Sequence, residues 1–118
     1  MIHGIGIDII ELKRIRQALF KNERFIDRIL SEREKRQYFH LEKEQRKLEF
    51  LAGRFAAKEA FAKAVGSGIG ELNFRDIEVV TNDDGAPQLR VSGYSSEKLF
   101  VSISHSKDYA VAQVVITI

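Results

Sequence analysis

The chain contains no cysteine among its 118 residues. This absence excludes catalysis by a thiol and metal sites built from thiolates, and it agrees with a reducing compartment. The sequence also lacks any hydrophobic run of membrane-spanning length, and its first residues carry no basic leader. We therefore expect a cytoplasmic protein that is neither processed nor inserted in a membrane.

The length and the charge distribution narrow the class of protein further. A chain of this length is typical of one domain, so we expect a single domain over residues 1–118. The net charge is only +2, which does not argue for a nucleic-acid partner. Between residues 12 and 30, however, six cations stand against two acids; the cations are Lys13, Arg14, Arg16, Lys21, Arg24 and Arg28. This local excess favours an acidic macromolecular partner, and a solvated helix face is the simpler alternative.

The first segment has the alternating pattern of a β-strand. Every second residue from Ile5 to Ile9 is an isoleucine, and the opposite face carries Gly4, Gly6 and Asp8. Asp8 is therefore expected to point away from the isoleucine face. The glycines beside it leave room for another backbone or a ligand to approach closely.

Helical patterns follow up to the middle of the chain. The spacing of apolar residues predicts short amphipathic helices over about residues 11–20 and 23–30. Ser31 and Glu34 match a capping box, which predicts that another helix begins there. A long helix is expected over about residues 43–65, with Gly66 as its C-terminal stop.

The second half of the chain has β character. Residues 77–80 and 88–91 are predicted to form a hairpin, and a second hairpin is predicted from residues 100–105 and 109–118. The last of these strands is apolar at nearly every position, so we expect a helix on one face and another subunit on the other. The predicted fold class is α+β, with an antiparallel sheet packed against the long helix and the shorter helices.

Two carboxylates are candidates for a metal site. Glu59 interrupts an apolar stripe on the long helix, and Asp8 lies near the end of the first strand. Mg²⁺ is commonly held by one or two carboxylates, with water and substrate phosphate as its other ligands. Two alternatives remain open: an ion pair of Glu59 with Lys63, worth about 0.2–0.5 kcal/mol, and a helix N-cap role for Asp8.

A glycine cluster is a candidate for phosphate binding, and a lone histidine stands near the end of the chain. Residues 66–70 read Gly-Ser-Gly-Ile-Gly, which is more glycine than a helix stop requires, although a helix stop is the alternative explanation. His105 precedes a turn between two serines, and a lone histidine is more often structural than functional. The cluster matches neither the Walker loop nor the dinucleotide fingerprint.

Four blocks of the sequence together resemble one known family. These blocks are residues 4–9 (Gly-Ile-Gly-Ile-Asp-Ile), residues 50–61 with the glycine-rich tail, residues 76–78 followed by Gly85 and Pro87, and residues 102–106 (Ser-Ile-Ser-His-Ser). They resemble the holo-acyl-carrier-protein synthases, the small bacterial class of 4'-phosphopantetheinyl transferases, over essentially the full length. Ser67 stands where a threonine is common in the family, and this change keeps the hydroxyl.

The resemblance implies a coenzyme A site with a divalent metal. Asp8 and Glu59 match the family's Mg²⁺ ligands, and Lys63 matches a lysine that contacts phosphate. The loop residues Gly66, Ser67, Gly68 and Ile69, together with Pro87, match positions beside the nucleotide. Arg54, His105 and Ser106 match positions that reach the nucleotide's phosphates from a neighbouring subunit, because the family forms trimers with a site at each subunit boundary.

The resemblance also implies the partner and the reaction. Arg14, Arg24, Phe25 and Arg28 match the surface that docks the acidic acyl carrier protein. The implied reaction transfers the 4'-phosphopantetheine arm of coenzyme A to a serine of the apo carrier protein and releases 3',5'-ADP, in fatty acid biosynthesis. The rival hypothesis is a non-catalytic basic module that binds an acidic protein or RNA.

Overall fold

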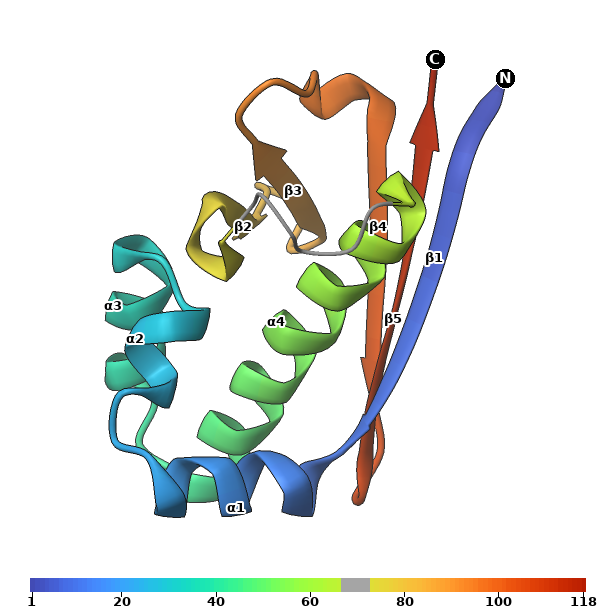
Figure 1. The fold of residues 1–118 in the computed structure, drawn as a ribbon. Helices are drawn as coiled ribbons and strands as arrows, with labels where there is room; N and C mark the ends of the chain where they lie inside the picture. Colours follow the sequence, from blue (N-terminus) through green and yellow to red (C-terminus); the bar gives the residue numbers. More distant parts are fainter. Residues whose placement is uncertain (67–72) are drawn as a thin grey trace.

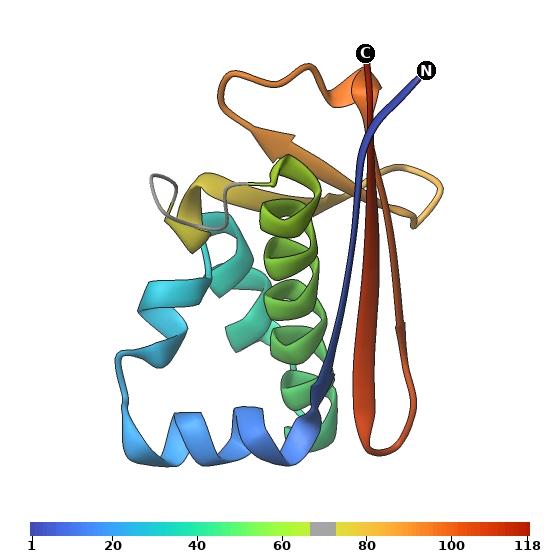
Figure 2. The same cartoon turned by 45° about the vertical axis from the view of Figure 1, so that its right-hand side comes forward.

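The fold is built around one long helix that lies along a three-stranded sheet. The computed structural model describes residues 1–66 and 73–118. Helix α4 (Glu44–Val65) packs against strands β1 (Ile2–Glu11), β5 (Tyr109–Thr117) and β4 (Leu99–His105). The sheet is antiparallel with the order β1-β5-β4. Figures 1 and 2 show α4 on one face of this sheet, with both chain termini at the same end.

The short helices lie on the other side of α4. Helices α1 (Leu12–Lys21), α2 (Phe25–Ile29) and α3 (Glu32–His40) form a chain of short helices beside it (Figure 1). A two-stranded antiparallel sheet of β2 (Ile77–Thr81) and β3 (Pro87–Val91) follows. Two 3-10 turns, η1 (Phe74–Asp76) and η2 (Ser96–Lys98), complete the described elements. The predicted α+β class is confirmed.

The local signals for helix ends are also confirmed. At the start of α3, Ser31 Oγ accepts a hydrogen bond from the Glu34 amide at 3.2 Å, and Glu34 Oε1 accepts one from the Ser31 amide at 2.9 Å. Helix α4 ends at Gly66, whose φ of 93° lies in the left-handed region that glycine adopts readily. The N-cap alternative for Asp8 is wrong, because α1 begins after Glu11.

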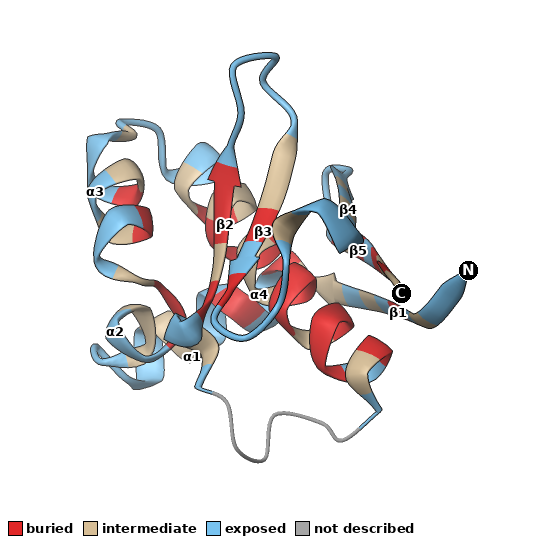
Figure 3. Cartoon of the chain, turned by 90° about the horizontal axis from the view of Figure 1, so that it is seen from above, coloured by how far each residue is buried: buried red, intermediate tan, exposed pale blue. Residues whose placement is uncertain are grey.

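The core lies on both sides of α4. One cluster joins α4 to the sheets, and a second joins it to α1, α2 and α3. Because α4 is covered from two directions, half of its residues are buried. Figure 3 shows these buried positions along the helix. Among the described residues, no helix has both the length and the apolar character needed to cross a membrane.

Glycines in β1 allow the strand to approach α4 very closely. A Cβ placed on Gly6 would collide with the carbonyl oxygen of Ala60, and one placed on Gly4 would collide with that of Ala64. The prediction that these glycines admit another backbone is confirmed, and the backbone is that of the helix. This close contact places the Asp8 side chain beside α4.

The Gly6→Ala substitution is therefore expected to destabilise the fold. The new methyl group meets helix backbone, which cannot rotate away, so we expect a loss of about 1–3 kcal/mol or more. Gly53→Ala is the matched control, because its Cβ would lie 3.1 Å from the Cγ2 methyl of Ile103, and a shift of that side chain by a few tenths of an ångström relieves the contact. Urea denaturation of both variants measures the difference; equal stabilities would contradict the close packing of β1 on α4.

The outer face of the three-stranded sheet is apolar and exposed. Ile5, Ile7, Ile9 and Phe100 are between 54% and 64% exposed. Residues of β5 alternate between buried positions that face α4 and positions on this outer face. The sequence predicts a cover on both faces of β5; within the described part of the chain, α4 provides one of them.

Candidate functional site

The side chains of Asp8 and Lys63 meet where β1 contacts α4. Lys63 Nζ donates hydrogen bonds to Asp8 Oδ1 and to the Ile7 carbonyl oxygen, each at 3.0 Å. Asp8 is mostly buried, with 15% of its side chain exposed, whereas Lys63 keeps 54%. Lys63 therefore pairs with the acid of the neighbouring strand. The ion pairs found in residues 1–66 and 73–118 do not include one of Lys63 with Glu59, so that alternative is not supported.

Glu59 brings a second carboxylate to the same place. Burial raises the pKa of Glu59, the negative charge of Asp8 raises it further, and Lys63 opposes both effects. Two neighbouring carboxylates, one of which has its pKa raised by the charge of the other, form a donor set that suits a divalent cation. The described residues contain no group of three or more metal-binding side chains. A cation here would take two protein ligands and complete its shell from water and phosphate, as Mg²⁺ does.

The raised pKa of Glu59 predicts how stability depends on pH in metal-free protein. Because the folded state holds this proton more tightly than the unfolded chain, the ionised form of Glu59 opposes folding, and stability rises as pH falls through the raised pKa. The Glu59→Gln variant should therefore melt at a higher temperature than the wild type at pH 7. The difference should shrink below about pH 4.3, where the carboxyl is protonated in both states. Thermal melts in EDTA at both pH values test this; a lower melting temperature at pH 7 would contradict it.

A basic and aromatic pocket opens beside Glu59. It has a volume of about 730 Å³ and lies between α2, α4 and η1. Its lining includes Arg24, Phe25, Asp27, Arg28, Ile29, Phe55, Glu59, Asn73, Phe74 and Arg75. The Phe55 ring stacks on the Phe74 ring with 5.4 Å between their centroids, and its centroid lies 6.2 Å from that of Phe25. We refer to this as the α2–α4 pocket.

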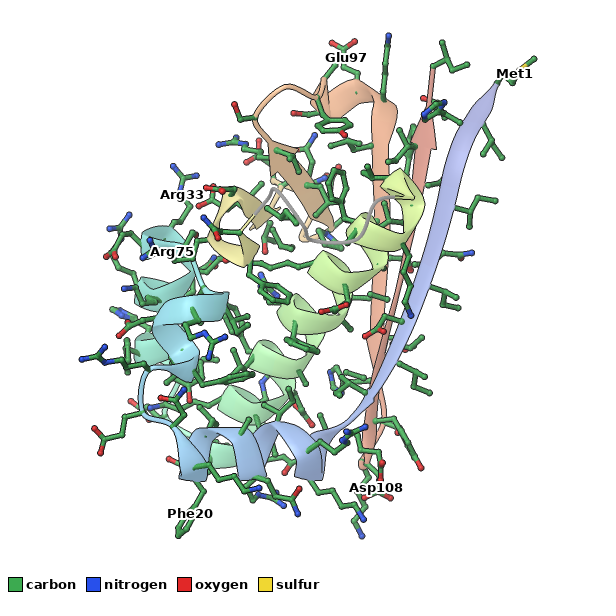
Figure 4. The ribbon with its side chains drawn as sticks, viewed as in Figure 1. Met1, Phe20, Arg33, Arg75, Glu97 and Asp108 are labelled. Carbon is green, nitrogen blue, oxygen red and sulfur yellow. The ribbon has the colours of Figure 1, made fainter. Side chains whose placement is uncertain are left out.

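The structure brings most of the predicted carrier-binding residues to this pocket. Arg24, Phe25 and Arg28 line it, and Arg14 is exposed on α1 outside it. Phe20, at the far end of α1, is 90% exposed and points away from the molecule in Figure 4. The basic surface along α1 and α2 therefore continues to the carboxylate of Glu59.

A second pocket holds other predicted site residues. It has a volume of about 210 Å³, and Arg54, Pro87 and His105 are among its lining residues. Ser106 follows β4 in the next turn, where its Oγ accepts a hydrogen bond from the Tyr109 amide at 3.3 Å. The α2–α4 pocket and this pocket have no lining residue in common. We refer to it as the Arg54 pocket.

Arg54 contributes a partly buried guanidinium group to this pocket. Its guanidinium lies 4.0 Å from the centre of the Phe50 ring, and burial lowers its pKa. Its Nε atom is buried and finds no hydrogen-bond acceptor among the described residues. His105 Nδ1 lies 3.6 Å from Glu49 Oε2, which is too long for a hydrogen bond. An anionic group would supply the acceptor that Arg54 lacks.

The remaining predicted site residues belong to the glycine cluster. Gly66 ends α4 in the left-handed conformation. Ser67, Gly68 and Ile69 lie outside the described residues.

Sequence reasoning missed several residues of the site. Phe55, Phe74 and Arg75 line the α2–α4 pocket, and Lys58 forms a buried ion pair with Glu34. Lys58 carried a detectable signal, since it is a charge within a run of alanine and phenylalanine on α4. Nothing in the local sequence connects η1 to α4.

Comparison with known proteins identifies the family. A family model described as the 4'-phosphopantetheinyl transferase superfamily matches residues 4–114. Because this match covers most of the chain, the chain belongs to that superfamily. The resemblance found in the sequence is confirmed.

Full-length relatives make the assignment more specific. The holo-[acyl-carrier-protein] synthase of Oceanobacillus iheyensis is 59% identical, over 98% of this chain and 97% of the relative. That of a Geobacillus species is 60% identical over the same shares. A crystal structure of the Bacillus anthracis holo-(acyl-carrier-protein) synthase in complex with CoA (3',5'-ADP) is 55% identical, with a TM-score of 0.89. That match covers 98% of this chain and 96% of the other.

Proposed function

We propose that this protein transfers the 4'-phosphopantetheine arm of coenzyme A to a serine of apo acyl carrier protein. The products are holo acyl carrier protein and 3',5'-ADP. The observation that carries this proposal is the full-length similarity to a synthase structure in complex with CoA (3',5'-ADP), in a chain that brings Asp8, Glu59 and Lys63 together. We further propose that the chain acts as a single domain over residues 1–118, in cytoplasmic fatty acid biosynthesis.

Asp8 and Glu59 would hold Mg²⁺ together with the pyrophosphate of coenzyme A. When bound, Mg²⁺ would neutralise the negative charge that develops on the phosphates during transfer. Lys63, with 54% of its side chain exposed, is long enough to leave Asp8 and donate to a phosphate oxygen. The main chain at Gly66, followed by Ser67, Gly68 and Ile69, would bind beside the nucleotide.

The carrier protein would bind on the basic surface of α1 and α2. Arg24 and Arg28 would attract its acidic residues, and the phenylalanines of the α2–α4 pocket would receive apolar side chains. Docking there would place the acceptor serine next to Glu59, which lines the same pocket. Arg14 would extend the docking surface along α1.

We propose a homotrimer with active sites shared between subunits. The exposed outer sheet face, with Ile5, Ile7, Ile9 and Phe100, supports an interface there, since apolar patches of this kind mark association surfaces. The separation of the two pockets supports a shared site. Arg54, Pro87, His105 and Ser106 would reach the phosphates of a nucleotide held by Asp8 and Glu59 of the neighbouring subunit.

Mixing two inactive variants tests the shared site. His105→Ala and Glu59→Gln subunits should regain activity after exchange, because some boundaries would combine an intact Glu59 with an intact His105. A mixture of Asp8→Asn with Glu59→Gln is the matched control and should gain none, because every site would carry one defect. Mixed oligomers that demonstrably form from the first pair, yet remain inactive, would contradict the proposal.

The reaction itself is tested by following 3',5'-ADP. Chromatography should detect this product when the protein, coenzyme A and apo carrier protein are combined with Mg²⁺. EDTA should stop its release, and Mg²⁺ in excess should restore it. No product with Mg²⁺ present would favour the non-catalytic binding module, and product formation that EDTA does not affect would contradict the metal site alone.

A further inference from the structure

Two charged side chains are completely buried where α2, α3 and α4 meet. Glu34 and Lys58 have no solvent exposure, and no other charged residue within residues 1–66 and 73–118 is buried. Lys58 Nζ lies 2.5 Å from Glu34 Oε1. Burial lowers the pKa of Lys58, and the opposing charge of Glu34 counteracts this effect. Apolar residues can often replace a buried ion pair without loss of stability, so stability alone does not explain the Glu34–Lys58 pair.

Lys58 Nζ and the two carboxylate oxygens of Glu34 each form a hydrogen bond with the backbone of a different element. Lys58 Nζ donates a second hydrogen bond, at 2.6 Å, to the carbonyl oxygen of Ile29, the last residue of α2. Glu34 Oε1 accepts from the Ser31 amide at the start of α3, and Glu34 Oε2 accepts from the Val79 amide in β2, both at 2.9 Å. The pair therefore connects four elements through one buried centre.

This centre lies directly behind the α2–α4 pocket. Ile29, whose carbonyl Lys58 holds, lines the pocket together with its α2 neighbours Phe25 and Arg28. Glu59, the residue after Lys58 in α4, lines the same pocket. Two consecutive residues of α4 therefore contact opposite sides of the pocket: Glu59 lines it directly, and Lys58 binds the carbonyl oxygen of Ile29 in the α2 wall.

Helix α2 needs such an anchor. It has only five residues, and a helix of that length is not stable by its own hydrogen bonds. Its one basic residue, Arg28, is exposed, and its one buried residue is Ile29 at the C-terminal end. The hydrogen bond from Lys58 reaches that same residue.

We propose that Lys58, paired with Glu34, is a positioning residue that sets the place of α2 relative to Glu59. It thereby controls how the carrier protein's serine meets the reacting phosphate. This inference rests on the proposed transfer activity. It assigns Lys58 an effect on the reaction of the carrier protein, with little effect on coenzyme A, whose pyrophosphate would be held by Asp8, Glu59 and Lys63 and not by α2.

Steady-state kinetics of two variants test the inference. Lys58→Met removes the donor at nearly constant volume, and Lys58→Met combined with Glu34→Gln also removes the remaining buried charge. For both, kcat/KM for the carrier protein should fall about 10–100-fold, the loss expected when reacting groups are displaced by about 1 Å. The equilibrium dissociation constant for coenzyme A should stay within about twofold of the wild type.

A matched control separates positioning from general stability. Phe61→Leu alters a fully buried residue one turn further along α4, on the core facing the sheets. The assay temperature for Phe61→Leu is chosen so that this variant has the same fraction of folded protein as Lys58→Met. Phe61→Leu should keep the wild-type kcat/KM for the carrier protein. A fall in kcat/KM equal to that of Lys58→Met would overturn the inference. Wild-type kcat/KM in both Lys58 variants would overturn it as well.

Hydrogen exchange on the wild-type protein provides a readout that needs no variant. The Leu30 amide, which bonds to the Ile26 carbonyl at 2.9 Å, reports on the opening of α2. It should be as well protected as amides in the middle of α4, because Lys58 ties α2 to the core. Fast exchange at Leu30 beside a protected α4 would overturn the inference. Absence of any transfer by the wild type would instead refute the proposed function.

Discussion

A Glu59→Gln variant is expected to lose transfer activity by at least about 10²–10³-fold while keeping the wild-type fold. Glutamine has the same shape but lacks the charge that would hold the cation against the pyrophosphate. Burial and the nearby Asp8 charge raise the pKa of Glu59, so the amide also relieves a repulsion in metal-free protein. Loss of activity should therefore accompany equal or greater stability.

Initial rates with saturating Mg²⁺ and coenzyme A measure this effect. Asp8→Asn should lose activity similarly, although it also breaks the 3.0 Å ion pair with Lys63. Glu44→Gln, at the exposed start of the same helix, removes the same charge far from the pocket and should remain active. A Glu59→Gln enzyme with a rate near that of the wild type would remove Glu59 from the metal site.

Reversing Arg14 and Arg24 to glutamate should raise the KM for the carrier protein by at least about tenfold, which corresponds to about 1.4 kcal/mol. Both arginines are exposed on the basic surface of α1 and α2. Attraction between exposed charges is screened over about 8–10 Å at physiological salt. The wild-type KM for the carrier protein should therefore also rise with added salt.

Kinetics on both substrates at two ionic strengths make this test specific. The KM for coenzyme A should barely change, because Asp8, Glu59 and Lys63 would hold its phosphates and neither substituted arginine is among these residues. Arg33→Glu with Arg90→Glu is the matched control, since it reverses the same total charge at exposed positions outside the α2–α4 pocket. An equal rise of KM in this control would mean that net charge, and not the α1–α2 surface, attracts the carrier protein.

Local chemistry made much of the fold predictable. The Ser31–Glu34 capping box and the stop at Gly66 depend on residues within a few positions of one another, so their signals survive in the sequence alone. The alternation in β1 similarly separated Asp8 from the isoleucine face. What the pattern could not give was the element that packs on the glycines, because close approach to Ala60 is a property of the assembled fold.

The site itself depends on contacts between distant parts of the chain. Asp8 meets Lys63 across 55 positions, and Val79 donates to Glu34 across 45. The sequence identified Asp8 and Glu59 by residue type, and the resemblance supplied their roles. The Glu34–Lys58 pair was missed because Glu34 already had a sufficient local explanation as a capping residue. The separation of Arg54 and His105 from the α2–α4 pocket likewise follows from three-dimensional packing.

The intact mass of the carrier protein is the most direct measurement of the proposed function. Apo acyl carrier protein incubated with this protein, coenzyme A and Mg²⁺ should gain the mass of one phosphopantetheine arm. A carrier protein whose acceptor serine is replaced by alanine should gain nothing under the same conditions. An unchanged mass of the intact apo carrier protein, with folded protein and Mg²⁺ present, would contradict the proposed transfer.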